Sequence, residues 1–266
     1  MRFLYPYCVV VLILSTTQLL QAAEMLYPLS VAATDKGPLY VADRKLPGIW
    51  SVEQGKAASY FTGSKVFRTP LNAVRCVTID NEGRVLAGDS STREVYRFEK
   101  AGAKPQPLTN GGIGIPMDVV VLKNGDLLVS DLELHHIWKV PAAGGKPTLF
   151  AKVEAPRGLA LDQAENLWVV SGTADQLLKV SPEGKVAVVV KGRPFNFPHD
   201  VVVLDDGSAK RHSGKSLLTE LPKNGCLANL SSIRWESPAR DRISWSPTRM
   251  RKRYFPLIWR KTSVIC

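Results

Sequence analysis

The chain has 266 residues, of which 45% are hydrophobic, so it is long enough to bury a sizeable core in one large domain or two smaller ones. Its net charge of +11 would suggest a nucleic-acid partner if the charge were spread evenly, but residues 208–266 alone carry 13 basic and three acidic side chains. The other 207 residues carry 22 basic and 21 acidic side chains. The body of the chain is therefore nearly neutral, which argues against a specific nucleic-acid surface there.

The N-terminal segment, residues 1–23, predicts a cleaved secretory signal peptide. Arg2 precedes the apolar run Cys8–Leu14, and small residues follow at Ala22 and Ala23. The run is too short for a stable membrane span, which needs about 20 apolar residues. We expect a secreted or periplasmic protein; an uncleaved N-terminal anchor, the alternative, would also place the body outside the cytoplasm.

From Pro28 onward the sequence repeats one pattern at intervals of 40 to 46 residues. The units start at Pro28, Val74, Pro116, Pro156 and Pro198, and the fifth follows the pattern only as far as Gly207. Self-similarity with this period is typical of a propeller or a solenoid.

Each unit is expected to form four short strands. In the third unit these are 118–122, 126–130, 136–140 and 147–153, separated by turn-forming residues. Many strands are apolar at consecutive positions, so both faces of each sheet must be covered, and no segment between them has the spacing of a covering helix. The sequence therefore predicts an all-β fold, a β-propeller of four-stranded blades, with a flat β-solenoid as the alternative.

The repeated pattern resembles that of a known superfamily. The units read P-x-[DG]-[VL]-x-[VL]-D-x-x-G-x-L-x-V-x-D, followed by a segment such as Ile137–Val140 (IWKV). This is similar to the NHL-repeat and SMP-30/gluconolactonase-like superfamily, over about residues 28–207. The resemblance implies a propeller, usually six-bladed and here incomplete, within residues 24–207. It leaves the activity open, because the superfamily includes lactonases, lyases and binding scaffolds.

The basic segment 208–266 does not continue the pattern. It lacks a G-x-L-x-V-x-D motif and is rich in Arg, Ser and Pro. We favour an altered reading frame, because the break falls inside a unit, directly after Gly207. The alternatives are a disordered cationic tail and a basic module for nucleic acid or anionic membrane.

Comparison of the units also distinguishes residues that cap loops from candidate site residues. The Asp that closes the second strand recurs at Asp43, Asp89 and Asp131, which predicts a turn-capping or loop-capping role. Residues that enter the first strand differ between units and converge on one rim of a propeller, so specificity is expected there. The predicted ligand-binding rim consists of Arg75, Asp118, Arg157 and His199.

These residues support two functions. Two guanidinium groups suit carboxylates, phosphates or sugar hydroxyls, so the leading hypothesis is an exported scaffold that binds a small molecule or a protein at this rim. The alternative is a metal-dependent, lactonase-like hydrolase or lyase, with His199 and Asp200 as catalytic residues.

A cofactor is expected only for the enzyme. Asp118, Asn196 and Asp200 could hold one divalent cation, Ca²⁺ or Zn²⁺, through oxygen. The resemblance implies a Glu, Asn and Asp set for the metal-dependent lactonases, and the first unit, PLSVAA from Pro28, has no such Glu. Two arginines beside the carboxylates also oppose a cation.

Overall fold

The computed structural model describes residues 25–34, 37–45, 48–173, 175–204 and 209–212. The predicted signal peptide lies outside these ranges, as does the basic segment beyond residue 212. Within them the chain forms four four-stranded antiparallel sheets and one two-stranded sheet. No helix among these residues is long and apolar enough to cross a membrane.

The first two sheets come from the first two sequence units. Sheet one contains β1 (Pro28–Ala33), β2 (Leu39–Asp43), β3 (Gly48–Glu53) and β4 (Lys56–Thr62). Sheet two contains β5 (Val74–Ile79), β6 (Val85–Asp89), β7 (Glu94–Phe98) and β8 (Gln106–Pro107). In both, each strand pairs with the next along the chain.

The third and fourth sheets repeat this order. Sheet three contains β9 (Pro116–Val121), β10 (Leu127–Asp131), β11 (His136–Val140) and β12 (Thr148–Lys152). Sheet four contains β13 (Pro156–Leu161), β14 (Leu167–Ser171), β15 (Leu177–Val180) and β16 (Val186–Val190). The expectation of four strands is confirmed for the first four units.

The fifth unit forms a two-stranded ladder. β17 (Asp200–Val203) pairs antiparallel with β18 (Ala209–His212), and Asp200 lies opposite His212. β18 occupies the place of a second blade strand although it lies beyond Gly207, in the segment that the sequence analysis left out of the repeat. Strand pairing uses backbone N–H and C=O groups, which every residue here carries. The segment AKRH can therefore form this strand although it lacks the G-x-L-x-V-x-D motif.

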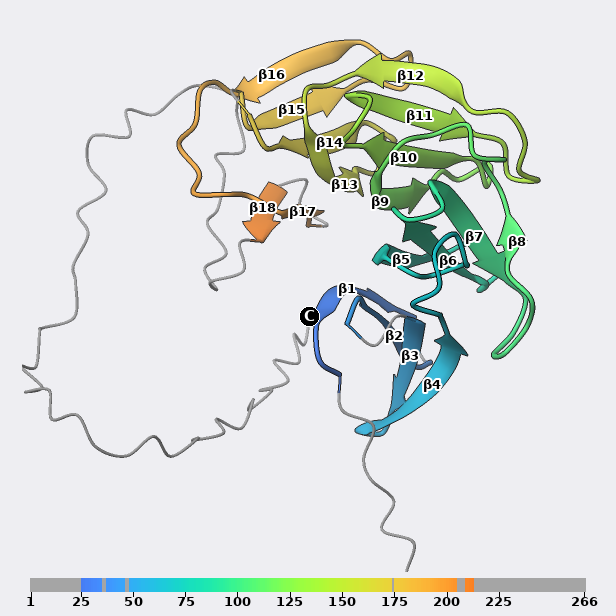
Figure 1. The fold of residues 1–266 in the computed structure, drawn as a ribbon. Coiled ribbons are helices and arrows are strands. Elements are labelled where there is room, and N and C mark those ends of the chain that lie inside the picture. The colour runs from blue at the N-terminus through green and yellow to red at the C-terminus, as the bar shows by residue number, and fades with distance from the viewer. Residues whose placement is uncertain (1–24, 35–36, 46–47, 174, 205–208, 213–266) are drawn as a thin grey trace, which may run out of the picture. The chain divides into compact units, whose positions relative to one another are not determined.

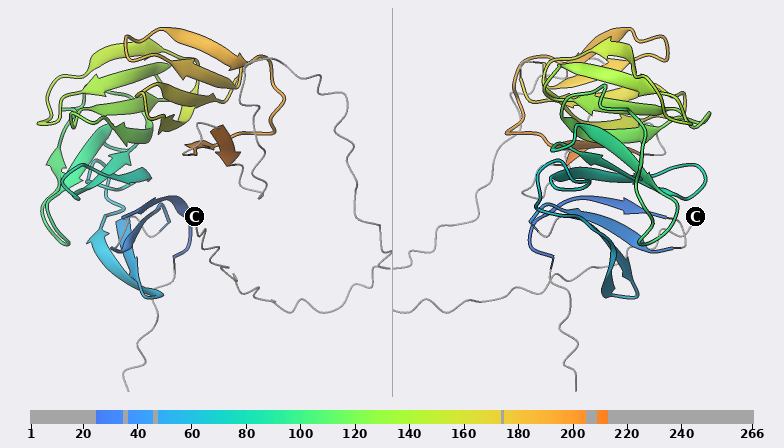
Figure 2. Two further views of the ribbon diagram at one scale, coloured as in Figure 1. Left: turned by 180° about the vertical axis from the view of Figure 1, so that it is seen from behind. Right: turned by 45° about the vertical axis from the view of Figure 1, so that its right-hand side comes forward.

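Apolar packing between consecutive sheets forms the core. In β10, Leu127 and Val129 pack toward β5 to β7, whereas Leu128 between them packs toward β13 to β15. The same sheet is thus buried on both faces, which explains why its strands are apolar at consecutive positions. Figures 1 and 2 show the four sheets following one another in chain order, and their first strands contact each other from β1 through β5 and β9 to β13.

The closing aspartates cap loops, as predicted. All three are fully buried, and each binds backbone N–H groups both upstream of its blade and directly after its own strand. The Asp131 carboxylate accepts hydrogen bonds from five donors: the backbone N–H groups of Gly114, Ile115, Glu133 and Leu134 and the indole N–H of Trp138, at 2.7 to 3.1 Å.

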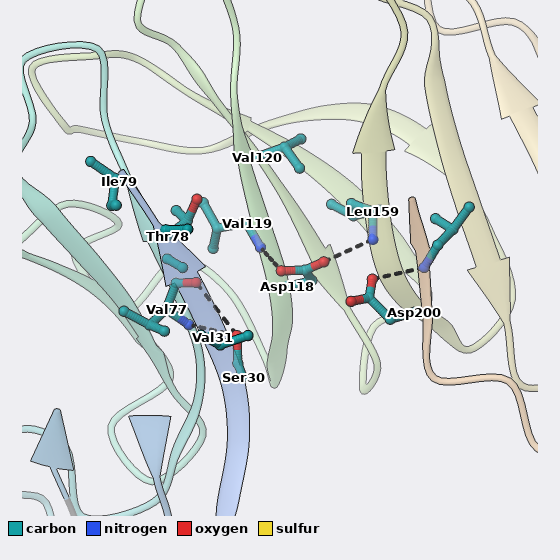
Figure 3. Close-up of a pocket in the computed structure, with 13 residues that line it drawn as sticks. Ser30, Val31, Val77, Thr78, Ile79, Asp118, Val119, Val120, Leu159 and Asp200 are labelled. Carbon is teal, nitrogen blue, oxygen red and sulfur yellow. Dashed lines mark hydrogen bonds between the residues drawn. The ribbon is translucent and has the colours of Figure 1, made fainter. Parts of the chain in front are cut away.

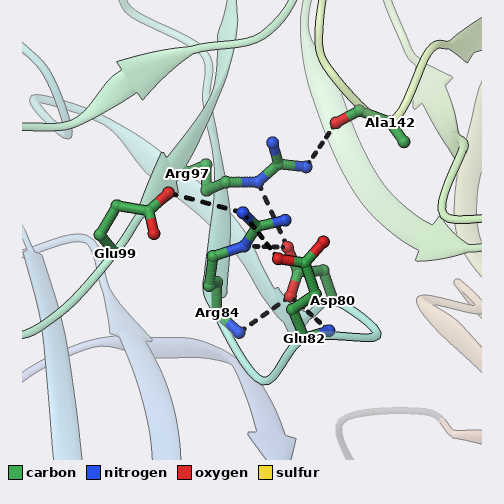
Figure 4. Close-up of polar contacts among 6 residues, drawn as sticks. All are labelled: Asp80, Glu82, Arg84, Arg97, Glu99 and Ala142. Carbon is green, nitrogen blue, oxygen red and sulfur yellow. Dashed lines mark hydrogen bonds and ion pairs between the residues drawn. The ribbon is translucent and has the colours of Figure 1, made fainter.

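Ion pairs fix the turns between first and second strands. In the second sheet, Asp80 binds both Arg84 (2.8 Å) and Arg97 (3.2 Å), and Arg97 also donates to the carbonyl of Ala142 in the third sheet (Figure 4). Lys139 and Lys179 take the place of Arg97 in the next two blades and pair with Asp126 and Asp162. This polar network therefore serves the fold.

Replacing Asp131 with alanine should strongly destabilise the protein. Five donors would lose their acceptor in a buried site, so we expect the free energy of unfolding to fall by about 3 kcal/mol in urea denaturation. Glu82→Ala is the control, because Glu82 is 69% exposed in its ion pair with Arg84, and its loss should change stability by less than about 0.5 kcal/mol. Equal effects of the two substitutions would contradict the capping role.

Candidate functional site

The first strands of neighbouring units are joined through the residue two positions after each unit start. In the first unit the hydroxyl of Ser30 accepts the backbone N–H of Val77 in β5 (3.2 Å), and in the third the carboxylate of Asp118 accepts that of Leu159 in β13 (2.8 Å). Gly158 holds this position in the fourth unit. A Cβ atom there would lie 2.4 Å from the Cα of Asp200, so only glycine lets β17 approach β13 this closely.

These strands border a cavity of about 280 Å³. Residues of β1, β5, β9, β13 and β17 line it, and its carboxylates are Asp118 and Asp200 (Figure 3). Each carboxylate also accepts the backbone N–H of the next residue, Val119 or Val201, at 2.8 Å. Two of the predicted site residues, Asp118 and Asp200, thus line the same open cavity.

The two carboxylates influence each other's ionisation. Burial, reinforced by the charge of Asp200, raises the pKa of Asp118 from 3.8 to about 8, against the opposing effect of its two backbone hydrogen bonds. This environment favours the protonated form of Asp118, which lies beside a second carboxylate.

The described residues do not complete a metal site here. Both Asp118 oxygens already accept backbone N–H groups, and Asn196, the third predicted ligand, is exposed and does not line the cavity. No group of three or more His, Cys, Asp or Glu side chains in the described part of the chain could hold an ion. Two carboxylates fall short of the ligand sets of calcium or catalytic zinc, so we derive no step through a cation.

The two predicted arginines lie one residue earlier in their units, where the first strand's pairing shifts register, and neither of them lines the cavity. Each side chain extends over the residue that follows the second strand of its own blade. The Nε–H of Arg75 donates to the hydroxyl of Ser90 at 3.2 Å.

Arg157 has no such partner. Gly172 takes the place of Ser90, and a Cβ atom added to it would lie 2.9 Å from Arg157 Nε. The Nε atom is buried and has no hydrogen-bond partner among the described residues. A buried guanidinium donor without an acceptor is costly, unless a ligand or water supplies one.

Aromatic residues cover this arginine. The ring of Phe197 lies 4.6 Å from the Arg157 guanidinium carbon, in cation–π geometry, and the ring of His199 meets Phe197 edge-on at 4.9 Å. Phe197 has a φ of 47°, in the left-handed region, so the backbone before β17 is held in a strained conformation that places the ring here.

The surroundings of the arginines are positively charged. Burial, together with the like charges of Arg44 and Arg157, lowers the pKa of Arg75 below its ordinary value, and burial also lowers that of Arg157. Arg44 and Arg157 thus each repel the partly buried guanidinium of Arg75, and an anion beside it would relieve this repulsion.

Sequence reasoning missed Arg44, Gly172 and Phe197. An alignment of the units at the residue that follows the end of the second strand would have shown that Ser90 in the second unit corresponds to Gly172 in the fourth. The roles of Arg44 and Phe197 depend on loop conformation, for which the repeat carries no signal.

Comparisons with known proteins identify the type of fold. No protein-family model matches the chain, and no curated protein matches it significantly. Several solved structures do match it. Virginiamycin B lyase from Staphylococcus aureus is 19% identical, with a TM-score of 0.58 and coverage of 74% of this chain and 70% of that one.

Two other matches are of different kinds. A gluconolactonase from Xanthomonas campestris is 16% identical (TM-score 0.60), with 71% of this chain and 70% of that chain covered. A chain of a nidogen/laminin complex is 18% identical (TM-score 0.60), with 69% of this chain and 71% of that chain covered. The described part of the chain has the fold of the SMP-30/NHL-like β-propellers, as the sequence pattern predicted.

The raised pKa of Asp118 predicts a dependence of stability on pH. Between about pH 4 and about pH 8 the folded state holds a proton that the unfolded chain has lost, so the stability contributed by this group falls as the pH rises through this range. Asp118→Asn cannot ionise. We expect its free energy of unfolding to improve relative to the unsubstituted protein from about pH 5 to about pH 8, in urea denaturation. Glu82→Gln, which is exposed, should show a constant difference, and a constant difference for Asp118→Asn would contradict the assignment.

Proposed function

We propose that the chain is an exported propeller that binds a small molecule through a carboxylate or phosphate group at the arginine rim, defined as Arg44, Arg75 and Arg157. The observation that carries the proposal is the buried Nε–H of Arg157, which has no partner among the described residues. A planar guanidinium binds a carboxylate or phosphate through two parallel hydrogen bonds, and Nε is one of the two donors on its side edge.

The electrostatics of the rim support the same class of ligand. The pKa values of Arg75 and Arg157 are lowered because burial disfavours their charged forms. An anion between them would offset both the dehydration and the mutual repulsion. A cation or a purely apolar ligand would relieve neither.

The neighbouring residues suggest the rest of the ligand. Phe197 covers Arg157 with a ring that is itself 57% exposed, which offers an apolar or stacking surface beside the anion. We infer a ligand with one anionic end at the arginine rim and an apolar or aromatic part against Phe197.

The competing hypothesis is a lactonase-like hydrolase or a lyase. Two of the similar structures, a lyase and a gluconolactonase, bear such names, while the third comes from a protein complex. Metal analysis of the purified protein separates the hypotheses. A stoichiometric Ca²⁺ or Zn²⁺ that is lost on Asp200→Ala would favour the enzyme and count against the arginine rim as the main site.

The binding proposal predicts that Arg157 dominates affinity for small anions. In calorimetric titrations of the full chain with citrate and with inorganic phosphate, Arg157→Gln should weaken binding by about tenfold to 100-fold, the range for a hydrogen bond to a charged group. Gly172→Ser is the sharper test. The added Cβ would lie 2.9 Å from Nε, so the serine side chain fills the space beside this donor and should weaken binding about tenfold without removing any charge.

Arg93→Gln is the matched control. Arg93 is 56% exposed and pairs with Glu133 at 2.6 Å, so its loss should leave affinity within about twofold. Thermal melting verifies that all variants are folded. If Gly172→Ser and Arg93→Gln bind citrate and phosphate as tightly as the unsubstituted protein, the Nε–H is not the ligand's donor and the proposal fails.

A further inference from the structure

A loop between β4 and β5 presents two adjacent apolar side chains to solvent. Val66 is 65% exposed and Phe67 is 75% exposed, the highest values among the large hydrophobic side chains of the described residues. Neither belongs to a strand, to the cavity or to the arginine rim. Exposure of two consecutive large apolar residues at a loop tip costs solubility and calls for an explanation.

The loop holds this tip in a defined conformation. The carbonyl oxygen of Val66 accepts hydrogen bonds from the backbone N–H and hydroxyl of Thr69 and from the side-chain amide of Asn72. Leu71, which is fully buried, fixes the end of the loop in the core. Arg68, with a φ of 60°, turns the chain sharply after Phe67. The exposed tip is therefore a feature of the folded loop.

Basic side chains surround the tip. Lys65 and Arg68 flank it, and Arg68 lies 5.3 Å from the centre of the Phe67 ring. The Nζ of Lys65 donates to the carbonyl of Arg44 at 3.1 Å, which brings the exposed side chains of Arg44 and Lys45 to the same place. Asp43, the neighbouring acid, is fully buried and accepts backbone N–H groups.

A second pair of exposed residues adjoins these cations. Leu26 is 45% exposed and Tyr27 is 54% exposed. The backbone N–H of Arg44 donates to the carbonyl of Tyr27 at 3.1 Å, so this pair lies directly beside Arg44. We call the combined surface the basic-apolar patch: Leu26, Tyr27, Arg44, Lys45, Lys65, Val66, Phe67 and Arg68.

We propose that the basic-apolar patch docks the protein on an anionic phospholipid surface, with the Val66–Phe67 tip entering the interfacial region. The charged residues of the patch are all basic, and each Lys or Arg near an anionic leaflet raises affinity about fivefold. A projecting tip of valine and phenylalanine gains affinity by entering lipid without needing a matching pocket. A protein partner would have to supply such a pocket. The patch shares Arg44 with the arginine rim, but the Val66–Phe67 tip, Lys65 and Arg68 do not belong to the rim, so variants of the tip test the patch separately from the small-anion site.

The test is co-sedimentation of the full chain with vesicles. Vesicles of phosphatidylcholine with 30% phosphatidylglycerol, about the charge of an anionic leaflet, should bind the protein, and pure phosphatidylcholine vesicles should bind it at least tenfold more weakly. Combining Val66→Asp with Phe67→Asp should lower the partition coefficient about tenfold or more, because both side chains lose their place in the lipid. Combining Lys65→Glu with Arg68→Glu should lower it about tenfold or more through charge.

A matched control addresses other causes of binding. Leu149→Asp places the same acid on another exposed apolar site, 48% exposed in β12, and should leave partitioning within about twofold. Residues 208–266 carry a net charge of +10, so they would add equally to the vesicle binding of every variant. Phe67→Ala, which keeps all backbone bonds of the loop, provides a milder variant should the aspartates impair folding.

The outcomes are decisive in both directions. Loss of partitioning in the tip variants, with folded proteins and an unchanged control, supports the docking surface. Equal partitioning of tip variants and control would overturn it, since the basic segment alone would then account for binding. Tip-dependent binding to soluble heparin or polyglutamate with no binding to vesicles would also overturn it and would indicate an acidic polymer or protein as the partner.

Discussion

Packing of sheet faces against neighbouring sheets is the constraint on which the rest of the structure depends. Leu128 packs toward one neighbouring sheet and Val129 toward the other, so the third sheet is buried on both faces. This packing brings the first strands within hydrogen-bonding reach of one another. The links from Ser30 to Val77 and from Asp118 to Leu159 follow from it, as does the close approach of β17 to Gly158.

Opposite charges occupy separate places at the first strands. Arg157 and Asp200 come from adjacent units, but Asp200 lines the cavity and Arg157 does not. The guanidinium groups lie at the ends of the second strands, and the carboxylates lie in the cavity. Burial, together with neighbouring like charges, lowers the pKa of Arg75 and raises that of Asp118.

The sequence was sufficient for the blades and the caps because both are periodic. Apolar runs at consecutive positions predicted sheets covered on both faces, and the recurring Asp43, Asp89 and Asp131 predicted the caps. It was insufficient for the site. Arg75 and Asp118 were grouped in one rim because both vary between units, whereas only Asp118 lines the cavity. β18 was missed because strand pairing needs backbone geometry rather than the repeat motif.

The difference between Ser90 and Gly172 shows how equivalent positions of a repeat protein can take different roles. Two blades place an arginine in the same register. In one blade the hydroxyl of Ser90 accepts a hydrogen bond from Arg75, whereas in the other the Nε–H of Arg157 has no acceptor among the described residues. The difference is a single side chain on a residue outside the strands, so it disturbs no core packing. Duplicated blades can therefore gain or lose a binding function, or move it around the ring, by exchanging small residues at the strand ends while the scaffold stays unchanged.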